Sequence, residues 1–235
     1  MTLADETARF LDNFRKNQPS AQSRAIIHER VLLLLKGYFF PNVKSSQITA
    51  GGLRDFFARW YIETGGYAKR ADQLPEPLDM LATVSDFLKW ADRQGRTNVY
   101  VRMAPLLTEL RHTLPRAVEI SKSLSNWLRE RGGAFSFPEF LTSFEEGGRS
   151  QYDIDEPDDD DRAVLEGHFR ILRAEGSLVE AEESISGRQV WPIVFPAHVA
   201  ALLDGAYTIN LEVVRTQEGW QITGCGFAHP PGTDG

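Results

Sequence analysis

The stretch Leu53-Arg-Asp-Phe-Phe-Ala-Arg-Trp-Tyr61 is the clearest secondary-structure signal in the chain. Its apolar residues recur at the three- and four-residue spacing that places them on one face of an α-helix. Thr49 can cap the beginning of this helix, and Gly65-Gly66 can end it. This part of the chain is therefore predicted to form an amphipathic helix with one buried face.

Helical patterns continue on both sides of this stretch. We expect further helices within residues 3–14 (with Thr2 as the cap), 23–36, 81–91, 105–113 and 115–131. Residues 23–36 are apolar nearly all round at their end, which predicts a buried helix that Gly37 ends. Pro105 and Pro115 suit the first turns of the last two helices. About six helices with short connections predict a compact helical domain.

The hydrophobic pattern changes after Gly132-Gly133 from helical spacing to short β runs. Residues 169–174 and 178–182 flank Glu175-Gly176-Ser177, which is a hairpin signal. Further strands are expected at 190–195, 207–213 and 220–224, with a helical turn at 196–204. Five short strands predict a small antiparallel β-sheet or barrel, so the expected fold class is α+β, with an all-α N-terminal domain.

These patterns divide the chain into four parts. We expect a helical domain at residues 1–134, a hinge and acidic linker at 135–164, a small β domain at 165–229 and a loose tail at 230–235. A length of 235 residues is sufficient for two such domains.

The composition is that of an ordinary globular protein. Of the residues, 42% are hydrophobic and 25% are charged, which excludes wholesale disorder. No apolar run exceeds five residues, far short of the roughly 20 that a membrane helix needs, and no secretory hydrophobic region follows Met1. The single cysteine, Cys225, excludes an internal disulfide. We therefore expect a cytoplasmic protein with no membrane partner.

The net charge of −7 conceals two oppositely charged halves. Residues 1–134 contain 20 Lys and Arg against 14 Asp and Glu, whereas residues 135–235 contain 6 against 19. Such asymmetry favours separate domains with different partners. Ordinary variation in the composition of solvated surfaces is the alternative interpretation.

The basic helical half is a candidate for contact with nucleic acid. Binding to a phosphate backbone requires several basic side chains on one surface. The candidate contacts, to nucleic acid or to another partner, are Arg54, Arg59, Lys69, Arg70, Arg93 and Arg96. Because these arginines have acidic neighbours in the sequence, ordinary surface charge is the competing explanation.

Residues 153–161 form a strongly acidic tract. The spacing Asp153-Ile-Asp155 begins like a calcium loop, but Pro157 replaces the glycine of the turn and Val164 occupies the position of the bidentate glutamate. Consecutive aspartates repel one another, which favours a solvated linker. The charge asymmetry also motivates the hypothesis of an intramolecular contact with the basic half, made by Asp158, Asp159, Asp160 and Asp161.

Two segments within residues 48–95 resemble a known family. Ile48-Thr-Ala-Gly-Gly-Leu-Arg-Asp-Phe-Phe57 and Ala82-Thr-Val-Ser-Asp-Phe-Leu-Lys-Trp-Ala-Asp-Arg-Gln-Gly95 resemble the helical, SAM-like core-binding segment of tyrosine recombinases. This resemblance implies a helical module that contacts DNA. The recombinase catalytic half has no counterpart after Gly133. The same segments are also similar to helices of uncharacterised bacterial and plasmid-borne proteins, which imply no activity.

A second resemblance lies in the β half. Residues 193–211 are similar to a strand–helical turn–strand unit of small barrels. A barrel of this kind implies no single function.

No pattern in the sequence identifies an enzyme. The histidines lack the spacing of metal ligands, and helical His28 and His112 are expected to be capping or surface residues. Cys225 has no helix N-terminus or cationic neighbour that the sequence places beside it, which favours a buried structural cysteine. We therefore predict no catalytic residue, cofactor or metal ligand.

Two functional hypotheses follow. The first is a bacterial-type binding or interaction module whose partner is a protein or a nucleic acid. The alternative is an enzyme whose site combines distant His residues (His168, His198 or His229) with Asp or Glu residues at a cleft between the domains. An exposed tryptophan would favour a binding hot spot, although all five are expected in the core: Trp60, Trp90, Trp127, Trp191 and Trp220.

Overall fold

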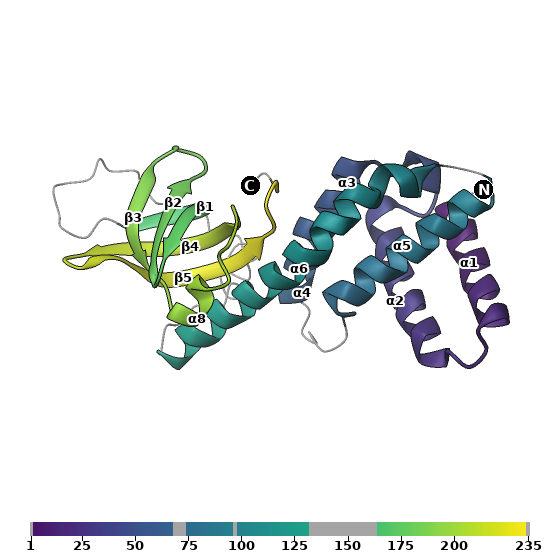
Figure 1. Cartoon of the computed structure of the whole chain (residues 1–235), viewed down its shortest axis with the longest axis horizontal. Helices are drawn as coiled ribbons and strands as arrows, with labels where there is room; N and C mark the ends of the chain where they lie inside the picture. Colours follow the sequence, from purple (N-terminus) through teal and green to yellow (C-terminus); the bar gives the residue numbers. More distant parts are fainter. Residues whose placement is uncertain (1, 68–73, 96–97, 132–163, 234–235) are drawn as a thin grey trace, which may run out of the picture. The chain divides into compact units, whose positions relative to one another are not determined.

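The computed structural model describes residues 2–67, 74–95, 98–131 and 164–233 (Figure 1). The chain forms two compact units, Met1–Pro115 and Arg116–Gly235, and the division falls within one long helix, α6 (Val99–Glu130). The first unit is helical, and the second combines the end of α6 with five strands. The predicted α+β class, with helices before strands, is confirmed. The sequence pattern predicts a domain boundary at residue 134, where helical spacing stops. The two compact units of the structure divide earlier in the chain, between Pro115 and Arg116.

The described residues of the helical unit form five helices before α6. They are α1 (Leu3–Asn17), α2 (Gln22–Phe39), α3 (Ala50–Asp55), α4 (Tyr61–Tyr67) and α5 (Pro77–Arg93). A 3-10 turn at Ser45–Gln47 precedes α3, and a π-helical segment at Phe56–Trp60 joins α3 to α4.

Two helices begin at the threonines that the sequence predicts as caps. The Thr2 hydroxyl accepts a hydrogen bond from the backbone N–H of Asp5 at 3.3 Å, and the Asp5 carboxylate accepts one from the backbone N–H of Thr2 at 3.0 Å. The Thr49 hydroxyl accepts from the backbone N–H of Gly52 at 3.1 Å. These bonds satisfy donors that a helix leaves unpaired in its first turn.

The predicted end of α2 at Gly37 is wrong, because the helix continues to Phe39. A glycine inside a helix costs about 1 kcal/mol relative to alanine. Packing offsets this cost, since Val31, Leu32 and Leu35 on the inner face of α2 are fully buried. The helix ends instead at Phe40, which has a φ of 64°.

The two helices predicted around Pro105 and Pro115 are one continuous helix, α6. Each proline removes one helical hydrogen bond, at a cost of about 3 kcal/mol. Apolar residues nevertheless keep helical spacing across both prolines, and most helical stability in proteins comes from packing of such a face. The fully buried members of this series are Val99, Leu110, Leu114, Ala117, Ile120 and Leu124.

His28 lies in the core of the helical unit, so the expectation of a capping or surface residue is wrong. Its side chain is 1% exposed, and its Nδ1 lies 2.8 Å from the hydroxyl oxygen of Thr83. Its ring packs edge-on against Phe10 and Phe14. Burial lowers the pKa of His28, with the nearby Arg24 acting in the same direction, so the neutral imidazole is favoured.

The described part of the second unit contains five strands whose pairings close into a barrel (Figure 1). The strands are β1 (Val164–Glu175), β2 (Leu178–Glu183), β3 (Gln189–Val194), β4 (Thr208–Thr216) and β5 (Gly219–His229), with the short helix α8 (Ala197–Ala200) between β3 and β4. The order around the barrel is β1-β2-β3-β5-β4. The predicted antiparallel arrangement holds for four pairs, but β3 and β5 are parallel.

Side chains along each strand point alternately into the barrel core and to its outer face. Phe169, Val179, Ile193, Ile209 and Val213 are all 0% exposed. The register between β1 and β2 shifts between Ile171 and Arg173, so Leu172 has no paired residue on β2 and is exposed.

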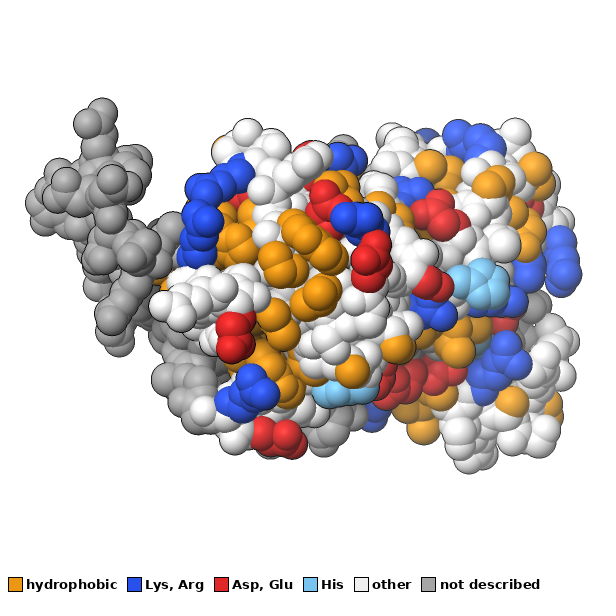
Figure 2. Space-filling model, turned by 60° about the vertical axis from the view of Figure 1, so that its left-hand side comes forward, with side chains coloured by type: hydrophobic (Ala, Val, Ile, Leu, Met, Phe, Trp, Pro, Cys, Tyr) orange, Lys and Arg blue, Asp and Glu red, His pale blue; other side chains and the backbone are white. Residues whose placement is uncertain are grey.

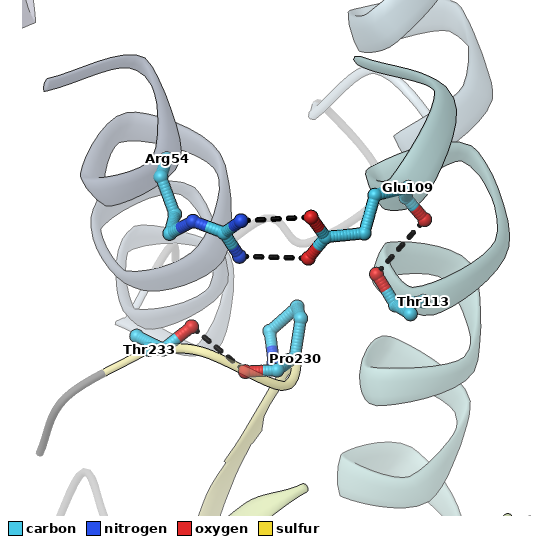
Figure 3. Close-up of polar contacts among 5 residues, drawn as sticks. All are labelled: Arg54, Glu109, Thr113, Pro230 and Thr233. Carbon is cyan, nitrogen blue, oxygen red and sulfur yellow. Dashed lines mark hydrogen bonds and ion pairs between the residues drawn. The ribbon is translucent and has the colours of Figure 1, made fainter. Parts of the chain in front are cut away.

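The end of α6 is tied to this unit by polar contacts. The Ser121 hydroxyl accepts a hydrogen bond from the backbone N–H of Ala228 at 2.8 Å, and Arg116 forms an ion pair with Asp204. In the segment predicted as a loose tail, Pro230 is buried, and its carbonyl accepts a 2.8 Å hydrogen bond from the Thr233 hydroxyl (Figure 3).

Candidate functional site

Trp191 on β3 differs from the other tryptophans in its exposure. Its side chain is 39% exposed, whereas the other four, all within the described residues, are half-buried or buried. An exposed tryptophan is the feature that favours a binding hot spot, because the ring offers a large apolar area at low entropic cost.

Two further exposed apolar side chains lie on β2, which pairs with β3, and on β1, which pairs with β2. Leu172 on β1 is 40% exposed, and Leu178 on β2 is 39% exposed. Leu178 pairs across the sheet with Val194 on β3, so apolar residues continue from strand to strand. We call the outer surface of β1, β2 and β3 formed by Leu172, Arg173, Leu178, Trp191 and Val194 the Trp191 face.

Arg173 connects the three strands of this face. Its guanidinium lies 5.0 Å from the centre of the Trp191 ring, a cation–π distance. The same group forms ion pairs with Glu175 at 3.0 Å and with Glu180 on β2. The charges beside Trp191 are therefore already paired with one another in the free protein.

A second charged pair lies on the same strands, where Arg170 meets Glu182 at 2.9 Å. Exposed pairs of this kind contribute little stability, typically below about 1 kcal/mol. Figure 2 shows hydrophobic side chains gathered in a patch on the barrel, with basic and acidic side chains along its border. An apolar centre with a charged border is the usual anatomy of a protein–protein interface.

Every strand of the barrel pairs with a neighbour on both sides. A partner strand would need an open edge with free backbone groups. The Trp191 face can therefore bind a partner through its side chains, rather than by adding a strand to the sheet.

The basic residues predicted as partner contacts have different surroundings. Arg54 forms two 2.8 Å hydrogen bonds to the carboxylate of Glu109 (Figure 3). Arg59 lies 3.4 Å from Glu63, four residues further along the chain. Arg93 is exposed in the last turn of α5. The remaining predicted contacts lie outside the described residues: Lys69, Arg70, Arg96, Asp158, Asp159, Asp160 and Asp161.

The histidines of the enzymatic hypothesis lie in different environments. His198 is exposed on α8, and His229 is buried at the end of β5. His168 on β1 pairs across the sheet with Asn210 on β4. The Nδ1 atom of His168 and the Oδ1 atom of Asn210 are both buried and make no hydrogen bond to any described residue.

Glu183, which the sequence analysis did not identify, is a buried carboxylate beside His168. Its oxygens accept hydrogen bonds from the backbone N–H groups of Ile185 at 2.9 Å and Ser186 at 2.6 Å. Burial raises the pKa of Glu183, but hydrogen bonds from Ser186 and Ile185 together with the nearby His168 outweigh burial and lower it. The carboxylate thus holds the turn between β2 and β3 in place. The polar Ser-Ile-Ser-Gly turn that follows Glu183 is the signal that could have indicated this role.

Cys225 lies inside the barrel and is 6% exposed. Burial raises the pKa of its thiol to about 12, so the reactive thiolate is disfavoured. This environment agrees with the predicted structural role. Within the described residues, no group of three or more His, Cys, Asp and Glu side chains is placed to hold a metal ion.

No protein family, curated protein or solved structure matches this chain. In the described part of the chain, no helix combines the length and the apolar character needed to cross a membrane. The assignment of a function therefore rests on the residues of the chain itself.

Proposed function

We propose that this chain is a binding module, and that the Trp191 face receives a partner protein. The exposure of Trp191 carries this proposal, because tryptophan and arginine are enriched among the residues that dominate binding energies. Leu172 and Leu178 add exposed apolar side chains to this face, and the ion pairs of Arg170 and Arg173 supply its charged groups.

The charges of this face favour a protein over a nucleic acid. Two arginines, Arg170 and Arg173, are matched by three carboxylates, those of Glu175, Glu180 and Glu182. A phosphate backbone would meet more negative than positive charge there, whereas apolar side chains of a protein would meet Trp191 and the leucines.

Site-specific photo-crosslinking tests the proposal. A benzophenone amino acid is placed at Trp191 or, as a control, at the exposed Val164 at the start of β1, which is 56% exposed. The protein captured from cells of the source organism is identified, purified and titrated against the wild type, Trp191→Ala, Leu178→Asp and Val164→Ala. We expect Trp191→Ala to weaken binding by about 30-fold and Val164→Ala by less than about threefold. Equal affinities for all four proteins, with unchanged circular dichroism, would contradict the proposal.

A second candidate function is nucleic-acid binding through the basic helical residues, with Arg54, Arg59 and Arg93 as its described members. One observation favours nucleic-acid binding as a class of function, although it concerns the barrel and not these helical residues. Five strands in the order β1-β2-β3-β5-β4, with a short helix between β3 and β4, have the topology of the oligonucleotide- and oligosaccharide-binding fold. This support is a fold-level analogy, and one fold hosts many functions.

Salt titration distinguishes the two functions. Binding of the full chain to fluorescent single- and double-stranded DNA and RNA is measured from low to physiological salt. Nucleic-acid binding predicts an affinity that falls steeply with salt and is weakened by Arg93→Ala. Absence of binding at low salt would exclude this candidate.

A further inference from the structure

Helix α2 carries an exposed apolar stripe that its sequence does not lead one to expect. The all-round apolar pattern predicts a fully buried helix, yet Ile26 is 53% exposed and Leu33 is 64% exposed. Phe40, which caps the end of the helix, is 71% exposed. On the opposite side, Val31 and Leu32 are fully buried. One face of α2 is thus packed into the helical unit, and the other is apolar and uncovered among the described residues.

The spacing of the stripe is regular. Ile26 and Leu33 are seven residues apart, and residues seven apart drift by only about 20° around an α-helix. Phe40 follows seven residues later, directly after the last helical residue, Phe39. The series extends over about 20 Å along the axis. Apolar anchors spaced seven residues apart along one side of a helix suit the docking of an amphipathic partner helix.

The backbone at Phe40 is strained. Its φ of 64° with a ψ of 140° is a conformation that residues other than glycine rarely adopt. Strain of this kind usually persists where packing or function requires it. Because 71% of the Phe40 side chain faces solvent, packing of the ring within the described residues offers little compensation. A binding role for the exposed ring would explain why phenylalanine occupies this position.

Gly37 lies between Leu33 and Phe40 on the same side of the helix. A Cβ atom added there would meet no other atom within 4 Å. The absence of a side chain leaves room for the backbone or a large side chain of a partner helix to approach α2 closely.

The charges beside the stripe are mainly positive. Arg30 and Lys36 lie on the same helix and form no ion pair with any described residue. Glu29, the acidic residue of α2, is held by Arg15 of α1 at 2.6 Å. A second copy of this chain would bring like charges together, whereas a partner with acidic side chains would pair with Arg30 and Lys36.

The width of the stripe favours a helix over a lipid surface as its binding partner. Helices that lie on membranes present a broad apolar face with a basic opposite face. The stripe on α2 is one residue wide and is bordered by Arg30 and Lys36. This geometry favours a single partner helix.

We infer that the stripe formed by Ile26, Leu33 and Phe40 docks an acidic amphipathic helix of a partner protein. The three side chains fill the apolar seam of that helix, and Arg30 and Lys36 pair with its flanking carboxylates. This surface belongs to the helical unit, and its residues are distinct from those of the Trp191 face.

The test uses a synthetic peptide of about three heptads, with leucine at the seam positions and glutamate at the flanking positions. Its binding to the full chain is measured by fluorescence anisotropy, and a peptide with lysine in place of glutamate serves as the charge control. The protein variants are Phe40→Gly and Leu33→Ser. Val101→Ser is the matched control, because Val101 is 69% exposed but lies on α6.

We expect Phe40→Gly and Leu33→Ser each to weaken binding of the acidic peptide by about tenfold or more, and Val101→Ser by less than about twofold. Glycine adopts the φ of residue 40 without strain, so Phe40→Gly should not lower the melting temperature. A loss of binding in this variant would therefore reflect the missing ring and not unfolding of the protein. We expect the lysine peptide to bind at least about tenfold more weakly, with affinity for the glutamate peptide falling as salt is raised.

Four results would overturn the inference. The first is equal binding of the two peptides, and the second is unchanged affinity in Phe40→Gly and Leu33→Ser. The third is a concentration-dependent dimer in analytical ultracentrifugation that Leu33→Ser abolishes, because a second copy would then occupy the stripe. Binding to vesicles that contain phosphatidylserine, with no binding to the glutamate peptide, would likewise exclude a helix partner.

Discussion

The guanidinium of Arg54 on α3 and the carboxylate of Glu109 on α6 form two parallel hydrogen bonds, each of 2.8 Å (Figure 3). The two residues are 55 positions apart in the chain. A bidentate pair of this geometry fixes both side chains and is stronger than a single contact. Arg54 was predicted to contact a partner, but its charge is directed to a neighbouring helix within the same unit.

Removing this pair should destabilise the helical unit. The Arg54 side chain is 27% exposed and that of Glu109 is 40% exposed, so solvent screens part of the attraction. We expect Arg54→Ala or Glu109→Gln to lower the free energy of unfolding by about 1 kcal/mol, and Arg54→Lys by nearly as much, because lysine cannot form both bonds. Urea denaturation of the single and double variants measures the coupling. Arg93→Ala is the control, and equal effects at Arg54 and Arg93 would show that the pair contributes nothing.

The lowered pKa of Glu183 predicts that the contribution of this residue to folding stability depends on pH. Its pKa is lowered in the folded state, so its stabilising effect is present above the ordinary carboxyl value near 4.5. The effect is lost as the pH falls through the lowered pKa of the folded protein. At neutral pH we expect Glu183→Gln to cost about 1–2 kcal/mol, because two backbone N–H groups lose a charged acceptor.

Urea denaturation at several pH values checks this expectation. The difference in unfolding free energy between wild type and Glu183→Gln should shrink on acidification. Glu182→Gln, which removes the half-buried partner of the exposed Arg170, should show a smaller difference at neutral pH. A difference for Glu183→Gln that stays constant down to acidic pH would contradict the assignment.

The Cys225 thiol should be unreactive in the folded protein. Burial inside the barrel raises its pKa to about 12 and limits access of reagents. We expect almost no reaction with an aromatic disulfide reagent at mildly alkaline pH, and complete reaction of the one thiol after unfolding in guanidinium. Rapid modification of the native protein would show that the cysteine is accessible.

Gly219, the first residue of β5 after the turn from β4, should not tolerate a side chain. It has a φ of 124°, and an added Cβ would lie 2.9 Å from the carbonyl oxygen of Pro192. Backbone strain and this contact together should make Gly219→Ala destabilising by about 2–4 kcal/mol. Gly176→Ala is the matched control, since Gly176 also has a positive φ, 61°, but open space around it. Similar melting temperatures for the two variants would show that the contact with Pro192 does not matter.

Much of the local structure could be predicted from sequence patterns. Thr2 and Thr49 cap helices, and the change of period after Gly132-Gly133 separates helices from strands, because caps and periodicity depend on residues a few positions apart. The continuity of α6 through Pro115 could not be predicted in this way. It depends on a buried face that offsets the cost of the proline, and the packing of that face is a property of the whole unit.

The exposed residues of the candidate binding surfaces could be identified only from the tertiary structure. Leu32 and Leu33 are adjacent and chemically identical, yet one is fully buried and the other is 64% exposed. Trp191 was expected in the core with the other tryptophans, but the register of β3 places it on the outer face.

The sequence by itself determined that helices precede strands. Only the tertiary structure decided which apolar faces are covered and which charges are paired. The physical reason is that the hydrophobic effect has no direction, so an apolar pattern predicts that a face will be buried without naming what buries it. Pairs such as Arg54 with Glu109 likewise join residues whose distance along the chain carries no local signal.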